Sequence, residues 1–159
     1  MHLYVMGHMQ KTLAPDPGPA LDPALCNCLA IRQAARQVTQ FYDRVMTGAG
    51  LTASQYSILA RLARLGPLSI NVLAAKMVMD RTTTGRAIRP LARDRLVAID
   101  AGTDARTRLV RLTPAGATRL KAAARRWRAA QQQFEEAYGA ADAAALRAAL
   151  ARVVAIDAR

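Results

Sequence analysis

Residues 79–113 read MDRTTTGRAIRPLARDRLVAIDAGTDARTRLVRLT and decide the fold. The first part predicts a helix over about 81–94, because side chains suited to one buried face return at helical spacing. These are Thr84, Ile88 and Leu91. The second part predicts two short strands, Val97–Ile99 and Arg108–Leu112, separated by a turn that contains Gly102. The stretch therefore predicts a helix that leads directly into a basic hairpin.

The outward face of this helix is polar and basic, which is typical of a helix that lies in the major groove of DNA. The candidate DNA contacts on the helix are Arg81, Thr82, Thr83, Thr84, Arg86 and Arg89. The hairpin tip offers Arg106, and an arginine on a thin loop suits the minor groove. The arginines could instead form a solvated face. The hairpin that follows them favours DNA binding.

The charge balance points to the same partner. The chain has 159 residues, with 23 Lys and Arg against 11 Asp and Glu, a formal charge of +12. An excess of this size is typical of proteins that bind nucleic acid, and the length predicts a single domain. No apolar run approaches the ~20 residues of a spanning helix, and no signal peptide opens the sequence. We therefore expect a cytoplasmic protein with no membrane association.

Upstream of residue 79, the sequence predicts three helices. The first covers about 24–47, and the second begins after Thr52, which stands at capping-box spacing from Gln55. A third starts near Ser69 and ends at a tight turn, where Asp80 can cap the next helix. Two helices joined in this way form a helix-turn-helix. The proline-rich residues 1–23 predict a disordered tail.

The C-terminal third predicts two more helices. Thr113 and Pro114 form a strong helix start, and Gly139 ends that helix before a last one from Asp142. The helices of 24–47 and 113–156 carry more apolar surface than one small winged domain can cover. We therefore expect a homodimer, which would place its two reading helices about 34 Å apart.

The fold predicted from these elements is mainly α. It is a winged helix-turn-helix with a three-helix core, a β-hairpin wing, and dimerisation helices at both ends. Residues 24–156 form the single domain, and its DNA-binding part covers about 51–112.

The order of elements resembles the MarR family of bacterial winged-helix regulators over residues 24–156. The motifs that carry the resemblance are Leu51-Thr52 with Gln55, Leu73-Ala74, Thr-Thr-Thr-Gly-Arg at 82–86, Pro90-Leu91, Leu96-Val97, Asp104-x-Arg106 and Leu112-Thr113-x-x-Gly116. The resemblance implies a dimeric repressor of an inverted-repeat operator that a small molecule or an oxidant releases. It also implies that Arg106 enters the minor groove and that Asp104 holds the loop. Arg95 departs from the pattern, because that position is commonly glycine in the family.

For such a regulator, we expect the effector pocket among the first, second and fifth helices. Arg32, Tyr42 and Tyr56 are the candidate polar contacts for an aromatic or phenolic ligand. Three further aromatic side chains are predicted to belong to the core or the dimer seam. These are Trp127, Phe134 and Tyr138.

Two cysteines, Cys26 and Cys28, leave an alternative open. On one helix they would point to nearly opposite faces, since two residues turn ~200°, so an intrachain disulfide is not expected. Cys28 stands 14 residues before Tyr42, which resembles the spacing in the OhrR-type hydroperoxide sensors of the family. The second sensor tyrosine would align with Ala53, so the pattern is incomplete. The other interpretation is that the cysteines are small buried side chains.

An enzyme is not predicted. Both histidines, His2 and His8, fall in the tail, and the adjacent Glu135 and Glu136 do not form a catalytic carboxylate pair. No metal set and no cofactor motif is visible. The remaining alternative is an architectural protein that binds DNA by charge with little sequence preference. Preference for one palindrome over random DNA would separate the two.

Overall fold

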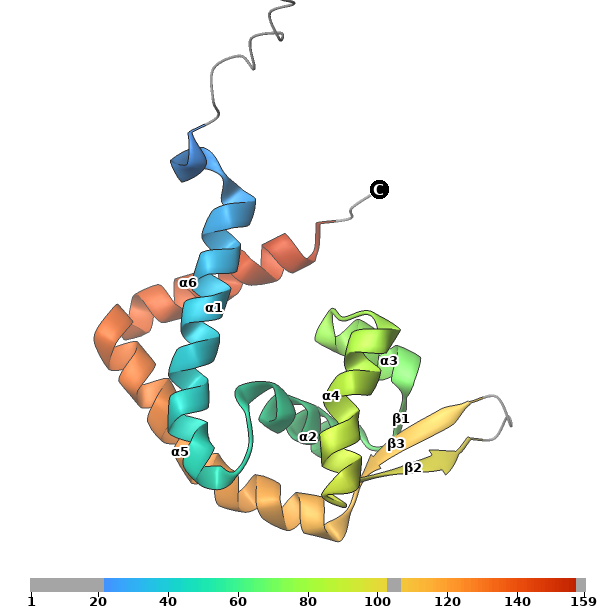
Figure 1. Ribbon diagram of the computed structural model, residues 1–159. Coiled ribbons are helices and arrows are strands. Elements are labelled where there is room, and N and C mark those ends of the chain that lie inside the picture. The colour runs from blue at the N-terminus through green and yellow to red at the C-terminus, as the bar shows by residue number, and fades with distance from the viewer. Residues whose placement is uncertain (1–21, 103–106, 157–159) are drawn as a thin grey trace, which may run out of the picture.

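The structure is a computed structural model that describes residues 22–102 and 107–156. It confirms the mainly α winged helix-turn-helix fold (Figure 1). The elements in chain order are η1 (Pro23–Leu25), α1 (Asn27–Met46), η2 (Thr47–Ala49), α2 (Ala53–Leu65), β1 (Leu68–Ser69), α3 (Ile70–Met77), α4 (Arg81–Arg93), β2 (Val97–Ala101), β3 (Arg108–Leu112), α5 (Pro114–Tyr138) and α6 (Ala140–Val154). In the described ranges, no helix combines the length and the apolar character that crossing a membrane requires.

The chain divides into two parts that α5 connects. We call α2, α3, α4 and the sheet the reading head, and α1, α5 and α6 the helical frame. In Figure 1, α1 stands alongside α5 and crosses α6, while the hairpin of β2 and β3 projects away from the frame. The arrangement leaves the hairpin on the side of the molecule remote from α1 and α6 (Figure 1).

The helices begin where the sequence places capping residues. Thr52 and Gln55 form the complete capping box of α2, in which each side chain bonds the other residue's backbone N–H. Ser69, Asp80 and Thr113 cap α3, α4 and α5 in the same way, each through a side-chain oxygen. Because these caps satisfy N–H groups that no helix can satisfy internally, they fix where each helix starts.

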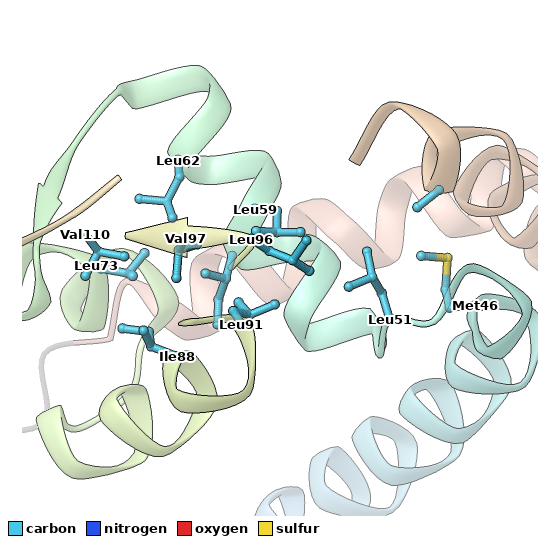
Figure 2. Packing of buried hydrophobic residues seen from close by; sticks show 12 residues of the cluster. Met46, Leu51, Leu59, Leu62, Leu73, Ile88, Leu91, Leu96, Val97 and Val110 are labelled. Carbon is cyan, nitrogen blue, oxygen red and sulfur yellow. The ribbon is translucent and has the colours of Figure 1, made fainter. Parts of the chain in front are cut away.

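The core of the reading head is built from one face of each of its helices (Figure 2). Leu59 and Leu62 of α2 pack with Ile88 and Leu91 of α4, all at most 2% exposed. Each such side chain contributes roughly 1.5–3 kcal/mol relative to an exposed one. The face of α4 opposite this core is left for solvent or a ligand.

The sheet has one more strand than the sequence predicted. Its order is β1–β3–β2, with β1 paired to β3 through Leu68 opposite Val110. Strand β2 also extends to Ala101, two residues past the predicted end. Two residues carry too little periodicity to be recognised as a strand, so only the tertiary pairing defines β1.

Two non-glycine residues that flank α4 adopt the left-handed conformation. Val78 in the turn before the helix has φ +52°, and Arg95 after it has φ +57°. This conformation costs about 1–2 kcal/mol for an L side chain, and Val78 is β-branched as well. Arg95 therefore takes the backbone shape that glycine would take, although it is not glycine.

We expect Arg95→Gly to raise the free energy of unfolding by about 1 kcal/mol, because glycine adopts this φ without strain. Val78→Gly should act in the same direction. Urea unfolding of each variant beside the wild type measures the change. A lower free energy of unfolding for Arg95→Gly would mean that the arginine side chain contributes more than its backbone conformation costs.

The N-terminal end of α1 differs from the prediction. A short 3-10 turn, Pro23–Leu25, is capped by Asp22, and Cys26 is extended with ψ 101°, so α1 begins only at Asn27. Proline at the first position fits the start of that turn, and the extended backbone of Cys26 separates the turn from α1. Of the predicted disordered tail of residues 1–23, residues 1–21 lie outside the described residues, whereas Asp22 and Pro23 form the cap and the first position of the 3-10 turn.

Candidate functional site

The exposed face of α4 carries two arginines that are free to meet a partner. Arg86 and Arg89 are exposed, and Thr82 lies beside them on the same face. Among residues 22–102 and 107–156, no carboxylate comes within salt-bridge distance of either arginine. The same side chains, with Gly85 between them and Ile70 of α3 alongside, line a shallow hollow. The positive charges of Arg86 and Arg89 on the exposed face of α4 form a surface that attracts phosphates.

The predicted threonine contacts separate into different roles. Thr83 donates its hydroxyl to Asp80 at 2.6 Å, so that hydroxyl is held at the helix start. Thr84 cannot be a DNA contact, because its side chain is 0% exposed and its hydroxyl donates to the Asp80 carbonyl oxygen at 2.9 Å. Of the three threonines, Thr82 alone stays exposed without a hydrogen bond from its side chain within the described part of the chain. Burial thus removes Thr84 from the candidate contacts.

Asp80 holds the first turn of α4 through its carboxylate. Hydrogen bonds from the Thr83 hydroxyl and from the Thr83 backbone N–H lower the pKa of Asp80 below its usual 3.8. A lowered pKa in the folded state means that the ionised carboxylate stabilises the fold above pH 3.8. This stabilisation disappears as the pH falls through the lower, folded-state pKa.

We expect Asp80→Asn to lower the melting temperature at neutral pH and to have a smaller effect at about pH 3. Asparagine can still cap the helix, but it carries no charge that the hydrogen bonds favour. Thermal unfolding of both proteins across this range measures the difference. An effect of equal size at both pH values would show that ionisation of Asp80 is irrelevant to the cap.

Beside α4, a small polar hollow of about 110 Å³ adds residues that the sequence analysis did not single out. Arg81 reaches it and donates to Asn71 Oδ1 of α3 at 3.3 Å. Arg108 of β3 and Thr107 line the opposite side. Arg81 is thus exposed beside α3, and its contact with DNA stays a prediction, while Asn71 and Arg108 join it only through tertiary packing. In the sequence, only the positive charge of Arg108 could have indicated that this residue belongs to the site.

Hydrogen bonds between β2 and β3 stabilise the hairpin. Arg111 Nε of β3 donates to Asp100 Oδ2 of β2 at 2.6 Å, and the Gly102 N–H donates to the Thr107 carbonyl at 2.7 Å. Both bonds hold the two strands together up to the tip. Asp104 and Arg106 of the tip lie outside the described residues.

A second site lies within the helical frame. A cavity of about 280 Å³ opens between α1, α5 and α6, next to the start of α2. Its walls are mostly apolar and are formed by Val38, Thr39, Tyr42, Ala53, Trp127, Gln131, Phe134, Ala143, Leu146, Arg147 and Leu150. A concave apolar space with a few polar groups is the usual form of a small-molecule site.

Three of the four polar side chains in the cavity wall take part in two pairs, and the fourth, Thr39, donates to the Ala35 carbonyl of its own helix. The Tyr42 hydroxyl donates to Gln131 Oε1, and Arg147 forms an ion pair with Glu135 at 3.2 Å. Burial raises the pKa of Tyr42, and the nearby Glu135 carboxylate raises it further, against the opposing effect of Arg147. Tyr42 therefore stays protonated at neutral pH. Because Glu135 neutralises Arg147, the cavity suits an uncharged ring better than a free anion.

The three predicted ligand contacts do not meet at this cavity. Tyr42 lines it, as predicted. Arg32 is exposed near the beginning of α1 and is not part of the wall. Tyr56 lies behind the wall, where its ring stacks on Trp127 at 4.7 Å. The contribution of α6 through Leu146 and Arg147 was not predicted, because periodicity identifies a buried face but not what it faces.

The cysteines lie at the start of α1 and differ from both expectations. Cys26 precedes the helix, and its sulfur accepts the Leu29 N–H at 3.4 Å, so the two cysteines are not placed on opposite faces of one helix. Both thiols are free and exposed, so the interpretation as small buried side chains is wrong for this chain. Cys28 stands 14 residues from Tyr42, which is about 21 Å along an α-helix, so they do not meet within one chain.

Comparison with known proteins identifies a family that has the same fold. Residues 49–107 match the model of the MarR family. No curated protein matches the chain.

Several solved structures share the fold. The transcriptional regulator MosR of M. tuberculosis, solved in complex with DNA, is 37% identical, with 79% of this chain and 97% of that chain covered and a TM-score of 0.67. A probable transcriptional regulator from Pseudomonas aeruginosa is 28% identical, with 83% and 99% covered and a TM-score of 0.74. BpsR of Bordetella bronchiseptica, whose DNA binding is regulated by 6-hydroxynicotinic acid, is 22% identical, with 88% and 100% covered and a TM-score of 0.76.

Proposed function

The chain belongs to the MarR family of transcriptional regulators, and from this we propose that it is a homodimeric repressor of an inverted-repeat DNA site, released by a small aromatic ligand. The observation that carries the proposal is the exposed arginine pair Arg86 and Arg89 on α4, which no carboxylate of the described residues approaches within salt-bridge distance. We place its action in the cytoplasm, where bacterial DNA is found.

In this proposal, α4 enters the major groove. Thr82, Arg86 and Arg89 face the base edges and phosphates, and Arg81 contributes a phosphate contact from the first turn. Asp104 and Arg106 then act at the wing tip, as the family resemblance implies. The MosR–DNA complex supports this placement, because that relative binds DNA with a similar fold.

The dimer would form through the helical frame. Apolar side chains of α6 and its end remain exposed in the single chain, including Leu150 at 41%, Val153 at 41% and Val154 at 62%. Exposed apolar surface of this kind is typical of an interface. A Val153→Asp/Val154→Asp variant, which leaves the cavity wall intact, should sediment as a monomer at concentrations where the wild type is a dimer. A wild-type monomer under those conditions would contradict the proposal.

The ligand would occupy the cavity of the helical frame. Trp127 and Phe134 offer flat apolar walls, and the Tyr42–Gln131 pair can bond a hydroxyl or carbonyl group. This chemistry favours an uncharged aromatic or phenolic molecule. The regulation of BpsR by a heteroaromatic acid supports the aromatic ring as the common element.

The DNA preference is tested by binding to the DNA that flanks the protein's own gene, with an excess of random competitor. A regulator keeps its specific complex, because specific sites are bound about 10³-fold or more tightly than random DNA. Loss of the complex to the competitor would favour the architectural alternative, in which charge alone binds DNA.

A second candidate function is a thiol-switched repressor that uses Cys26 and Cys28. The observation that favours it is the exposure of both thiols at the start of α1, where an oxidant can reach them. For this function, an organic hydroperoxide should dissolve the DNA complex and dithiothreitol should restore it. If the double variant Cys26→Ser/Cys28→Ser responds to peroxide like the wild type, the thiol switch is excluded.

A further inference from the structure

The aromatic rings of the chain form one continuous series of contacts. The sequence has one Trp, four Tyr and two Phe, and all of them except Tyr4, outside the described residues, take part. The ring pairs run from Tyr56 through Trp127, Tyr42, Phe41 and Phe134 to Tyr138. The series begins in the reading head and ends at the corner between α5 and α6.

Trp127 stands at the boundary between the two parts of the molecule. Its ring stacks on Tyr56 of α2 with a centroid distance of 4.7 Å and an interplanar angle of 14°. It also lines the cavity, where Tyr42 lies 5.0 Å away at 46°. Trp127 is therefore in contact with the reading head and with any molecule in the cavity.

Tyr56 is tied to the reading helix through its own helix. One and two turns further along α2, Leu59 and Leu62 are buried against Ile88 and Leu91 of α4. Tightly packed cores transmit displacements because they contain few voids that could absorb them. A shift of the Tyr56 ring would therefore move α2 and α4 together.

We propose that the Tyr56–Trp127 stack is the contact through which an aromatic molecule in the cavity changes the DNA affinity of the reading head. The inference rests on the proposed function and adds the route of regulation. A ligand shifts the equilibrium only by its difference in affinity for two arrangements, and reorienting Trp127 supplies such a difference. A stack of two rings can account for a change of about tenfold in an equilibrium constant.

Trp127 makes the proposal measurable, because it is the only tryptophan of the chain. By linkage, DNA binding must change the ligand affinity of the cavity by the same factor by which a ligand changes DNA affinity. We expect the emission of Trp127 to shift when the wild-type protein is saturated with the DNA flanking its own gene. The Tyr56→Leu variant, which lacks the stacked ring, should bind the same DNA without this shift. An unchanged emission in the wild type would overturn the proposal.

The second measurement uses 1-naphthol as the probe, compared with 1-naphthoate as its charged counterpart. In the wild type, 1-naphthol should quench Trp127 and weaken DNA binding about tenfold. Tyr56→Leu should keep the quenching but lose most of the effect on DNA. Tyr56→Phe is the matched control, since it keeps the ring without the hydroxyl, and it should respond like the wild type.

The outcomes distinguish a failure of the proposed route from a failure of the proposed function. If Tyr56→Leu is released by 1-naphthol as strongly as the wild type, the stack is not the route, although the proposed function stands. If 1-naphthol and 1-naphthoate both leave Trp127 unquenched in the wild type, the cavity is not the ligand site. That result would overturn the proposed route, because the route requires an aromatic molecule in the cavity, while specific DNA binding still decides whether the protein is a regulator.

Discussion

Gly116→Ala is expected to destabilise the protein by more than about 4 kcal/mol. Gly116 lies in the first turn of α5 and is buried against the base of the hairpin. A methyl group there would overlap the carbonyl oxygen of Leu96 and come within 2.8 Å of Leu112 Cδ1. The Leu96 carbonyl accepts the Thr113 N–H at 3.1 Å, so it cannot turn away without losing that bond. Chemical unfolding followed by circular dichroism measures the loss.

Gly85→Ala provides the matched control for this prediction. Gly85 is also helical, but a methyl group there meets nothing within 4 Å. We expect this variant to gain about 0.5–1 kcal/mol, because alanine loses less backbone entropy than glycine in a helix. Opposite signs for the two substitutions would confirm that packing determines the first effect. A mild effect of Gly116→Ala would mean that α5 can move away from the hairpin.

The double variant Arg86→Ala/Arg89→Ala is expected to weaken DNA binding by about 100-fold or more. Each arginine contact with a base or a phosphate contributes about 1–3 kcal/mol, and both side chains lie on the outward face of α4. If both contact phosphates, the salt dependence of the binding constant should also flatten by about two charges per subunit. Fluorescence anisotropy with labelled DNA at several salt concentrations measures both quantities.

The control for this variant removes the same charge elsewhere. Arg36 of α1 and Arg125 of α5 are exposed and lie in the helical frame, so Arg36→Ala/Arg125→Ala tests the effect of net charge alone. We expect this control to bind specific DNA within about threefold of the wild type, since distant exposed charges are screened. Equal losses in both double variants would indicate that DNA binding depends on total charge rather than on α4.

The parts of the fold that local sequence determines were predictable. The period of Thr84, Ile88 and Leu91 indicated which face of α4 is buried, and Thr52, Asp80 and Thr113 marked helix starts that the structure confirms. These signals depend on neighbouring residues and on elementary hydrogen bonding. They identified the exposed face of α4, and the position of Thr84 in the helical period already indicated its burial.

The parts that depend on tertiary packing were not predictable. Strand β1 exists only through its pairing with β3, and the cavity depends on how α6 crosses α1. Periodicity assigned Trp127 and Phe134 to the core or the dimer seam, because it cannot distinguish a core from the wall of a cavity. The extended Cys26 likewise reflects the 3-10 turn before it rather than any signal in the Cys-x-Cys motif.

Hydroxyl-radical footprinting of the DNA flanking the gene tests the central claim, that two copies of α4 read an inverted repeat. Two copies of α4 on an inverted repeat should protect two segments related by two-fold symmetry, with centres about 34 Å or one helical turn apart. The same segments should reappear in the presence of excess random DNA. A single protected segment without symmetry, or uniform protection along the fragment, would contradict the account.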